Sequence, residues 1–255
     1  MLVLPLHAPA AAVENIRIAY LGHAGSDAES GARQGTDEAN AQGRFLGFKY
    51  ELVTVSDVPG ALAAQAAALV VEVDGAGLAE LAAQATAMPV LNVSAEDDAL
   101  RGQCIANLFH TIPSQAMRAD AVAQWQRIHH DSHAVARAWH ESAEKYAGTQ
   151  LNKRYADRFG HPMSDQAWAA WAAVKLLSDT IARQRAVQPA ALLAALKTSL
   201  AFDGQKGIDM SFRDNGQLRQ PLLLIENGAI VGEAPVRGVA SENDLDSLGP
   251  THCSK

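Results

Sequence analysis

The N-terminal part of this sequence alternates short apolar segments with longer helical ones, and this alternation limits the fold more than any other feature. The apolar segments have the length and composition of buried strands, and they cover residues 15–22, 49–55, 68–75 and 89–94. Alanine-rich or polar helical segments separate them. Strands that alternate with helices form parallel sheets with right-handed crossovers. We therefore predict an α/β fold with a doubly wound parallel sheet.

The rest of the chain changes character. Residues 114–160 have the pattern of helices without a plausible strand, and Ser164 can cap a further helix. Short strands return near the C-terminus. There, Asn215-Gly216 and Asn227-Gly228 favour hairpin turns, because both residue types tolerate a positive φ. These strands predict a C-terminal hairpin region.

Composition excludes two kinds of partner. The 255-residue chain has a formal net charge of -7, and its basic residues cluster only in pairs, so we predict no nucleic-acid partner. No apolar run in the sequence reaches membrane-spanning length. The first residues, MLVLPLHAPAAAVE, resemble the apolar region and cleavage site of a secretory signal peptide without a preceding positive segment. We predict export, with residues 1–12 as a signal-peptide remnant.

The common phosphate-loop, dinucleotide, serine-hydrolase, zinc-protease and CxxC motifs do not occur in the sequence. We therefore predict no enzyme activity, no catalytic residues, no metal and no cofactor. One alternative is a metal-dependent enzyme, because His129 and His133 are four residues apart and can bind zinc or copper if both lie on a helix. The competing interpretation of these histidines is an exposed polar helix face.

A pattern punctuated by glycines near the C-terminus carries a family resemblance. It comprises Phe202-Asp203-Gly204, Gly207, Phe212, Asn215-Gly216, Pro221 and Asn227-Gly228. Together with the strand and helix at 16–43 and the helical stretch AWAAWAAVKLL, this pattern resembles type I periplasmic substrate-binding proteins, the branched-chain amino-acid-binding class of ABC importers. More specific stretches are similar to the subgroup associated with pyrroloquinoline-quinone (PQQ) alcohol dehydrogenase systems: DDALRGQC, HTIPSQAM, TQLNKRY, LRQPLLL and LDSLG.

The resemblance implies a periplasmic binding protein linked to a PQQ-dependent alcohol oxidation system. Such a protein binds a small ligand non-covalently and works with the membrane subunits of an ABC transporter. The implied ligand is PQQ or a small carboxylate or alcohol-derived molecule. The acidic pair Asp97 and Asp98 would repel a multiply anionic quinone unless a cation pairs with it.

The resemblance also suggests where the ligand binds, since ligands of doubly wound sheets lie beyond the carboxyl ends of the strands. Ser94 and Ala95 correspond to the loop that holds the amino-acid ligand in the wider family. Gly25 and Ser26 open a helix whose free N–H groups can hold a carboxylate, and Arg101 can add a bidentate contact. The alternative role of each residue is a helix cap or a salt bridge.

Trp125 is a further candidate, because it lies near the crossover to the second lobe and can stack on a planar ligand if its ring is exposed. His110 and Arg118 flank the same crossover and share that ambiguity. The other tryptophans are predicted to pack in the core or between helices.

The second lobe of this family needs several strand–helix repeats, and residues 113–155 offer room for helices only. We therefore predict that this lobe is largely missing. The predicted division is a signal-peptide remnant at 1–12, the first part of lobe 1 at 13–113, a helical segment in place of most of lobe 2 at 114–160, and elements completing lobe 1 at 161–255. Loss of a lobe would uncover apolar surface, so a partner-binding or homodimerisation module is an alternative function.

Cys104 and Cys253 are the only cysteines. In an exported chain they can form one disulfide that anchors the C-terminal tail to the loop after Arg101. The alternative is two unrelated thiols.

Overall fold

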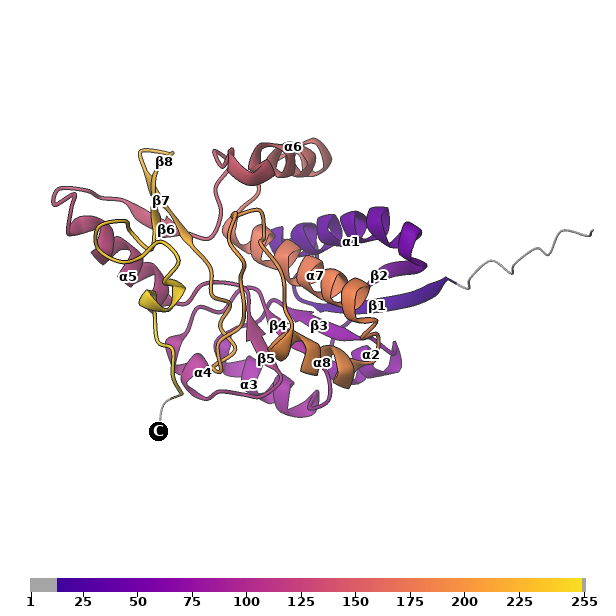
Figure 1. Cartoon of the computed structure of the whole chain (residues 1–255). Helices are drawn as coiled ribbons and strands as arrows, with labels where there is room; N and C mark the ends of the chain where they lie inside the picture. Colours follow the sequence, from indigo (N-terminus) through magenta and orange to yellow (C-terminus); the bar gives the residue numbers. More distant parts are fainter. Residues whose placement is uncertain (1–12, 254–255) are drawn as a thin grey trace, which may run out of the picture.

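The computed structural model describes residues 13–253. Its largest element is a five-stranded parallel sheet in the order β2-β1-β3-β4-β5, called the main sheet here (Figure 1). The strands are β1 (Glu14–Leu21), β2 (Phe48–Thr54), β3 (Ala68–Val71), β4 (Val90–Asn92) and β5 (Leu108–His110). The predicted α/β fold with a parallel sheet is confirmed. The signal-peptide remnant lies outside the described residues.

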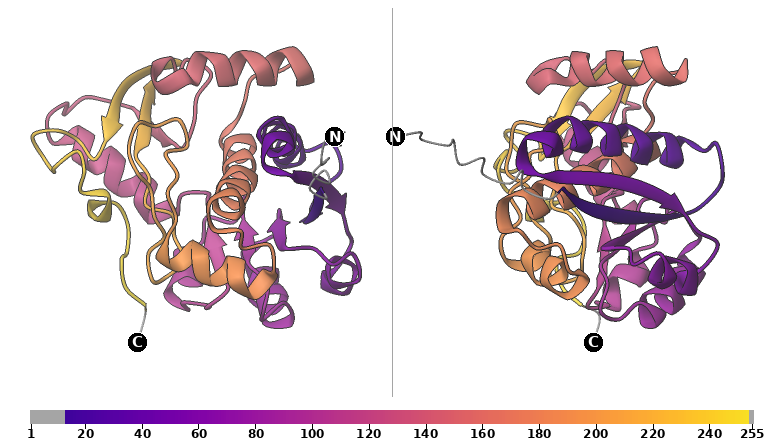
Figure 2. Two further views of the ribbon diagram at one scale, coloured as in Figure 1. Left: turned by 45° about the vertical axis from the view of Figure 1, so that its right-hand side comes forward. Right: turned by 90° about the vertical axis from the view of Figure 1, so that its right-hand side faces the viewer.

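Helices cover both faces of the main sheet (Figure 2). One layer consists of α1 (Asp27–Leu46) and α7 (Asp165–Gln184), and the other of α2 (Val58–Ala63), α3 (Gly75–Gln84) and α4 (Asp98–Gly102). Successive residues of a strand point to opposite faces, and so Val70 packs under α1 and α7 while Leu69 packs against α2 and α3. Burial on both faces explains why β3 is continuously apolar in sequence.

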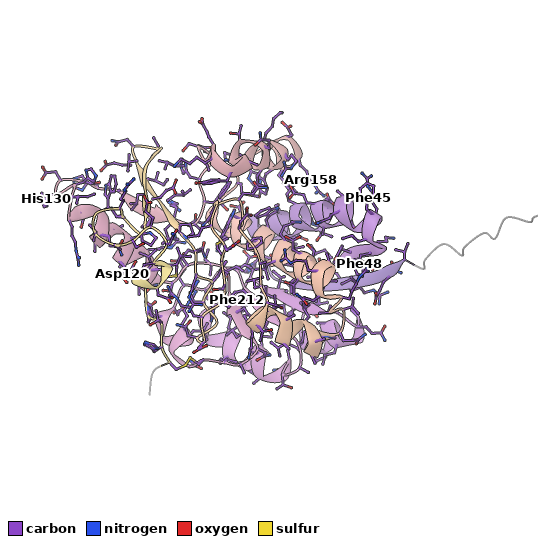
Figure 3. The ribbon with its side chains drawn as sticks, in the orientation of Figure 1. Phe45, Phe48, Asp120, His130, Arg158 and Phe212 are labelled. Carbon is purple, nitrogen blue, oxygen red and sulfur yellow. A yellow bond between two sulfur atoms is a disulfide. The ribbon has the colours of Figure 1, made fainter. Side chains whose placement is uncertain are left out.

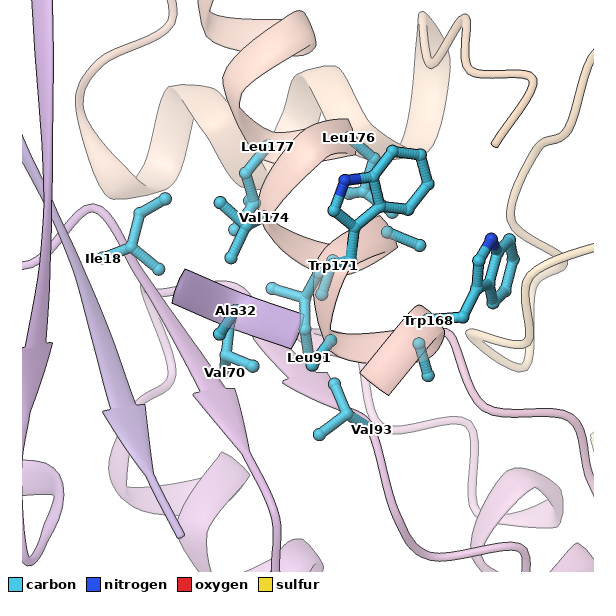
Figure 4. Packing of buried hydrophobic residues seen from close by; sticks show 14 of the residues in the cluster. Ile18, Ala32, Val70, Leu91, Val93, Trp168, Trp171, Val174, Leu176 and Leu177 are labelled. Carbon is cyan, nitrogen blue, oxygen red and sulfur yellow. The ribbon is translucent and has the colours of Figure 1, made fainter. Parts of the chain in front are cut away.

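Helix α7 lies at the centre of the core, where its Trp168, Trp171 and Val174 belong to the same buried cluster as residues of the main sheet and α1 (Figure 4). Helix α1 contacts α7 at two glycine residues, Gly31 and Gly35. A Cβ at Gly31 would overlap the backbone of Ala167, and a Cβ at Gly35 would lie 2.9 Å from that of Val174. The two helices can pack this closely only because α1 has no side chain at these positions.

We predict that Gly31→Ala lowers the free energy of unfolding by about 1–3 kcal/mol, because the added methyl group forces α1 away from α7. Gly77→Ala is the matched control. Gly77 is also helical, and a Cβ there has no neighbour within 4 Å, so this change should be neutral or stabilise by up to about 1 kcal/mol. Urea unfolding of both variants measures the difference, and equal stabilities would contradict the proposed close contact.

Helix α6 (Gly148–Phe159) lies on the outer side of α1, where Arg158 pairs with Asp37 and Arg154 pairs with Glu38 at 2.8 Å. Figure 3 shows Arg158 at the molecular surface. Helix α8 (Pro189–Thr198) packs against α7. The chain then returns to the main sheet, where the amide of His110 donates to Gly216 O at 2.8 Å.

A second sheet of three antiparallel strands stands beside the main one (Figure 1). It contains β6 (Val135–Arg137), β7 (Leu222–Glu226) and β8 (Ala229–Ala234), in the order β6-β7-β8. Helix α5 (Gln115–Gln126) packs on one face of this small sheet. These elements are called the small body here, and the main sheet with its helices is the main body.

The small body corrects two predictions. Residues 114–160 contain a strand, β6, which is only three residues long and therefore too short to show an alternating pattern. The hairpin of β7 and β8 builds a separate sheet with β6 and does not complete the main sheet. Its turn is formed as predicted, since Asn227 and Gly228 have φ of 51° and 76°. A hairpin sequence specifies the pairing of its own two strands but not the sheet that they join.

The C-terminal segment 241–253 runs from the small body back to the main body. The buried guanidinium of Arg213 holds it by donating to Leu245 O at 2.6 Å and Leu248 O at 2.8 Å. A disulfide joins Cys104 to Cys253, whose Cα atoms lie 5.6 Å apart. The C-terminal segment, which leaves the small body, is therefore fixed to the main body by hydrogen bonds and by a disulfide.

We predict that Cys253→Ser lowers the free energy of unfolding by on the order of 4 kcal/mol, because a cross-link over 149 residues restricts the unfolded chain strongly. Dithiothreitol should destabilise the wild type to the same extent and leave the variant unchanged. Two titratable thiols in the oxidised, denatured wild type would exclude the disulfide.

Candidate ligand cleft

A cleft of about 460 Å³ lies where the carboxyl ends of the main strands meet the small body. Ligands of doubly wound sheets bind at this end of the sheet. The main body contributes the residues that follow β1, β4 and β5 and the first turn of α7, and the small body contributes α5 and β6. The lining residues are Asp27, Glu96, Ile112, Arg118, Val135, Ala136, Arg137, Ser164, Asp165 and Gln166.

Arg118 on α5 bridges the two bodies inside this cleft. Its Nη1 lies 2.7 Å from Asp165 Oδ2 on α7 and donates to Ala136 O at 2.8 Å, while Nη2 donates to Glu96 Oε1 at 2.8 Å. Asp165 is 8% exposed, and its other oxygen accepts from the amide of Trp139. The Nε of Arg118 is buried and has no partner in the described part of the chain. Arg118 thus holds the cleft walls together and keeps one donor unused.

The remaining charges of the cleft have both signs. Asp27 follows the N-cap of α1 with a side chain that is 43% exposed, and Glu96 is 34% exposed. Arg137 on β6 is exposed and lines the same cleft. The cleft therefore presents acceptors on the side of the main body and a cation on the side of the small body.

Gly25 and Ser26 do not offer the free donors that the sequence suggested. The amide of Gly25 donates to Glu29 Oε2 at 2.7 Å, and Ser26 Oγ donates to Glu72 Oε2 at 2.7 Å while it caps the amide of Glu29. Tyr20 also donates to Glu72, at 2.6 Å, and burial raises the pKa of its phenol. Carboxylates of the chain itself therefore occupy the start of α1.

Ser94 and Ala95 lie in the loop after β4, at the predicted edge of the sheet. Asn92 Oδ1 accepts from both amides, at 3.1 and 2.9 Å, and Ser94 Oγ donates to Val73 O at 3.1 Å. Ala95 is buried. These hydrogen bonds fix the conformation of the loop, and the next residue, Glu96, lines the cleft.

Arg101 does not face the cleft, which corrects the prediction of a ligand contact. Its side chain is fully buried and donates to Gln217 Oε1 at 2.9 Å, Ala95 O at 2.8 Å and Ile112 O at 3.1 Å. Burial lowers its pKa to about 10, so it stays charged at neutral pH. Arg101 fixes the loops behind the cleft in place.

Trp125 is also a packing residue. Its ring packs against Gly232 and against the His129 ring, with centroids 3.8 Å apart, and its Nε1 donates to Ser132 Oγ. Helix α5 ends at Gln126, so His129 and His133 do not lie on a helix. The helical spacing on which the metal-binding alternative depends is therefore absent. Among residues 13–253, no group of three or more His, Cys, Asp or Glu side chains is arranged to hold a metal ion.

His110 is a core residue whose burial lowers the pKa of its ring well below the usual value.

Sequence reasoning left Arg118 ambiguous and missed Asp27, Arg137 and Asp165. Asp165 follows the predicted N-cap Ser164, so its place at a helix start was visible, but its distance from α5 was not. Glu96 adjoins the predicted pair Ser94 and Ala95.

Solved structures with a similar fold are periplasmic binding proteins. The leucine-, isoleucine-, valine-, threonine- and alanine-binding protein from Brucella ovis, in its closed conformation, aligns with a TM-score of 0.74 over 95% of this chain and 98% of its own, at 14% identity. The fold is that of the type I periplasmic binding proteins. An ABC-type branched-chain amino acid transporter from Rhodopseudomonas palustris aligns with a TM-score of 0.70, at 13% identity, over 94% of this chain and 100% of its own.

The substrate-binding protein LivJ from Streptococcus pneumoniae, solved in complex with isoleucine, aligns with a TM-score of 0.66 at 13% identity over 86% of this chain and 99% of its own. No family model and no curated protein matches the chain. The predicted resemblance is thus confirmed for the fold, while the PQQ-associated subgroup stays a prediction. None of the helices within residues 13–253 combines the length and apolarity of a membrane span.

We predict that Arg118→Met lowers the free energy of unfolding by about 3–5 kcal/mol, because it leaves the buried carboxylate of Asp165 without its cation. Lys153→Met is the control, since Lys153 and Asp157 form an exposed pair at 2.7 Å that should contribute less than about 1 kcal/mol. Adding Asp165→Asn to Arg118→Met should recover part of the loss. Equal, small effects of Arg118→Met and Lys153→Met in urea unfolding would show that Arg118 does not bridge the bodies.

Proposed function

We propose that this chain is the periplasmic substrate-binding component of an ABC importer, which binds a small ligand in the cleft and passes it to membrane subunits without catalysing a reaction. The observation that carries this proposal is the cleft at the strand ends, with Arg118 fixed between the bodies and charges of both signs around it. The fold and the ligand-binding roles named for the similar structures support it.

The charges of the cleft favour a small ligand with one carboxylate and one ammonium group, such as an amino acid. Arg137 is suited to a carboxylate, and Asp27 and the second carboxylate oxygen of Glu96 are suited to an ammonium group. PQQ is the competing ligand, and with it the link to a PQQ-dependent alcohol oxidation system. The lining carboxylates of Asp27, Glu96 and Asp165 disfavour a molecule with several negative charges.

Thermal shift with leucine, alanine, lactate and PQQ tests the choice of ligand. We expect leucine or alanine to bind with micromolar to millimolar affinity, and a ligand present at about 100 times its Kd stabilises the folded state by about 2.7 kcal/mol. A thermal shift with PQQ alone would show that the ligand is the quinone and not an amino acid. No shift with any of the four would refute the proposed ligand class.

We further predict that Arg137→Gln and Asp27→Asn each weaken amino-acid binding by about tenfold or more, since each removes one charged partner. Glu51→Gln is the control, because Glu51 is an exposed residue of β2 and does not line the cleft. Isothermal titration calorimetry gives the three affinities, and an unchanged Kd in both cleft variants would move the binding site elsewhere.

A homodimer is the second candidate, and the free edge of β8 favours it. β8 is the outer strand of the small sheet, its Val231 is 39% exposed, and within the described residues it pairs on one side only. An edge strand of this kind can pair with its copy. Sedimentation equilibrium of the wild type and of Val231→Glu decides this: a dimer that the variant dissociates supports the pairing, and a monomeric wild type excludes it.

A further inference from the structure

A second cavity, of about 440 Å³, lies apart from the ligand cleft and shares no lining residue with it. It opens between the segment 142–146, which leads into α6, and the strands β7 and β8. Leu223 and Ile230 form its apolar wall, and both side chains are partly buried. Cavities of this size with apolar walls and a few polar groups are typical of small-molecule sites.

Tyr146 adds an aromatic ring to this cavity, and it is 55% exposed. Its backbone has a φ of 52°, which is unfavourable for a bulky residue. The ring packs against Gly207, where a Cβ would overlap with it. Strained residues of this kind persist only where their surroundings fix them, and they gather at ligand sites. Tyr146 is therefore held at the cavity with much of its surface available to a ligand.

The exposed charges of the cavity are mainly negative. Glu144, Glu233 and Glu242 line it together with Lys145. Lys145 pairs with Glu233 at 3.0 Å. Glu144 and Glu242 are exposed, and neither has an ion-pair partner within residues 13–253. Two carboxylates of this cavity are thus free to bind a cation.

Lys206 also lies in the wall, but it is buried and its donors are used. Nζ donates to Gln220 Oε1 and to Pro221 O, both at 2.9 Å, and lies 3.9 Å from the centre of the Trp168 ring. These three acceptors match the three N–H donors of a charged amine. A cationic ligand avoids this buried charge when its own ammonium group stays near the exposed carboxylates.

We propose that this cavity binds a small protonated amine that carries an aromatic group. The ammonium group lies with Glu144 and Glu242. The aromatic group of the ligand packs between the Tyr146 ring and the apolar wall of Leu223 and Ile230. The site is independent of the proposed transport function, because none of these residues lines the ligand cleft.

Isothermal titration calorimetry with phenethylamine, 2-phenylethanol and phenylacetate tests the charge of the ligand. The three probes have similar size and are positive, neutral and negative at pH 7. We expect phenethylamine to bind with a Kd of about 0.1–1 mM, and 2-phenylethanol to bind at least about fivefold more weakly. Phenylacetate should bind weakest. Equal affinities for the three probes, or no binding of phenethylamine at about 10 mM, would overturn the proposal.

Variants of the wall test the position of the site. The double change Glu144→Gln with Glu242→Gln, and separately Tyr146→Ala, should each weaken phenethylamine binding by at least about threefold. Glu80→Gln is the control, because Glu80 is an exposed residue of α3 that lines neither cavity. Asp27→Asn separates this site from the ligand cleft and should leave phenethylamine binding unchanged. Binding that Asp27→Asn abolishes and the wall variants keep would place the amine in the cleft and overturn the proposal.

Discussion

Close packing of α1 against α7 is the contact on which the rest of the structure depends. Both helices begin at the cleft, with Asp27 and Asp165 in their first turns. The distance between these two carboxylates is therefore set by Gly31 and Gly35, which have no room for a Cβ. A wider separation of the helices would draw Asp165 away from Arg118 and open the contact between the two bodies.

Electrostatic balance in the cleft follows from this arrangement. Several carboxylates are brought to the carboxyl ends of the strands, where desolvation without partners would be costly. Two interactions offset this desolvation cost. Glu72 accepts hydrogen bonds from Tyr20 and Ser26, and Asp165 forms an ion pair with Arg118 of the small body. Asp27 and Arg137 line the cleft outside these two interactions and are left for a ligand.

The fold of the main body could be predicted from sequence, because strand and helix patterns are local and the inner strands β3 and β4 are buried on both faces. The small body could not, since the three residues of β6 show no periodicity and their partner β7 lies more than 80 positions later in the chain. For the cleft, the sequence indicated the loops that lie near it but not the side chains that line it. Ser94 and Arg101 were chosen as donors, yet their hydrogen bonds are used within the loops, and the long-range approach of α5 to α7 brings Arg118 into the site instead.

The Cys104–Cys253 bond gives the small body a topology that the strand order does not reveal. All of its elements lie between the two cysteines, so they belong to one covalently closed ring that starts and ends on the main body. Hydrolysis of a peptide bond in the exposed 127–133 turn would therefore leave a single molecule, whose two pieces separate only after reduction. The exposed turn can be cut without releasing either wall of the cleft.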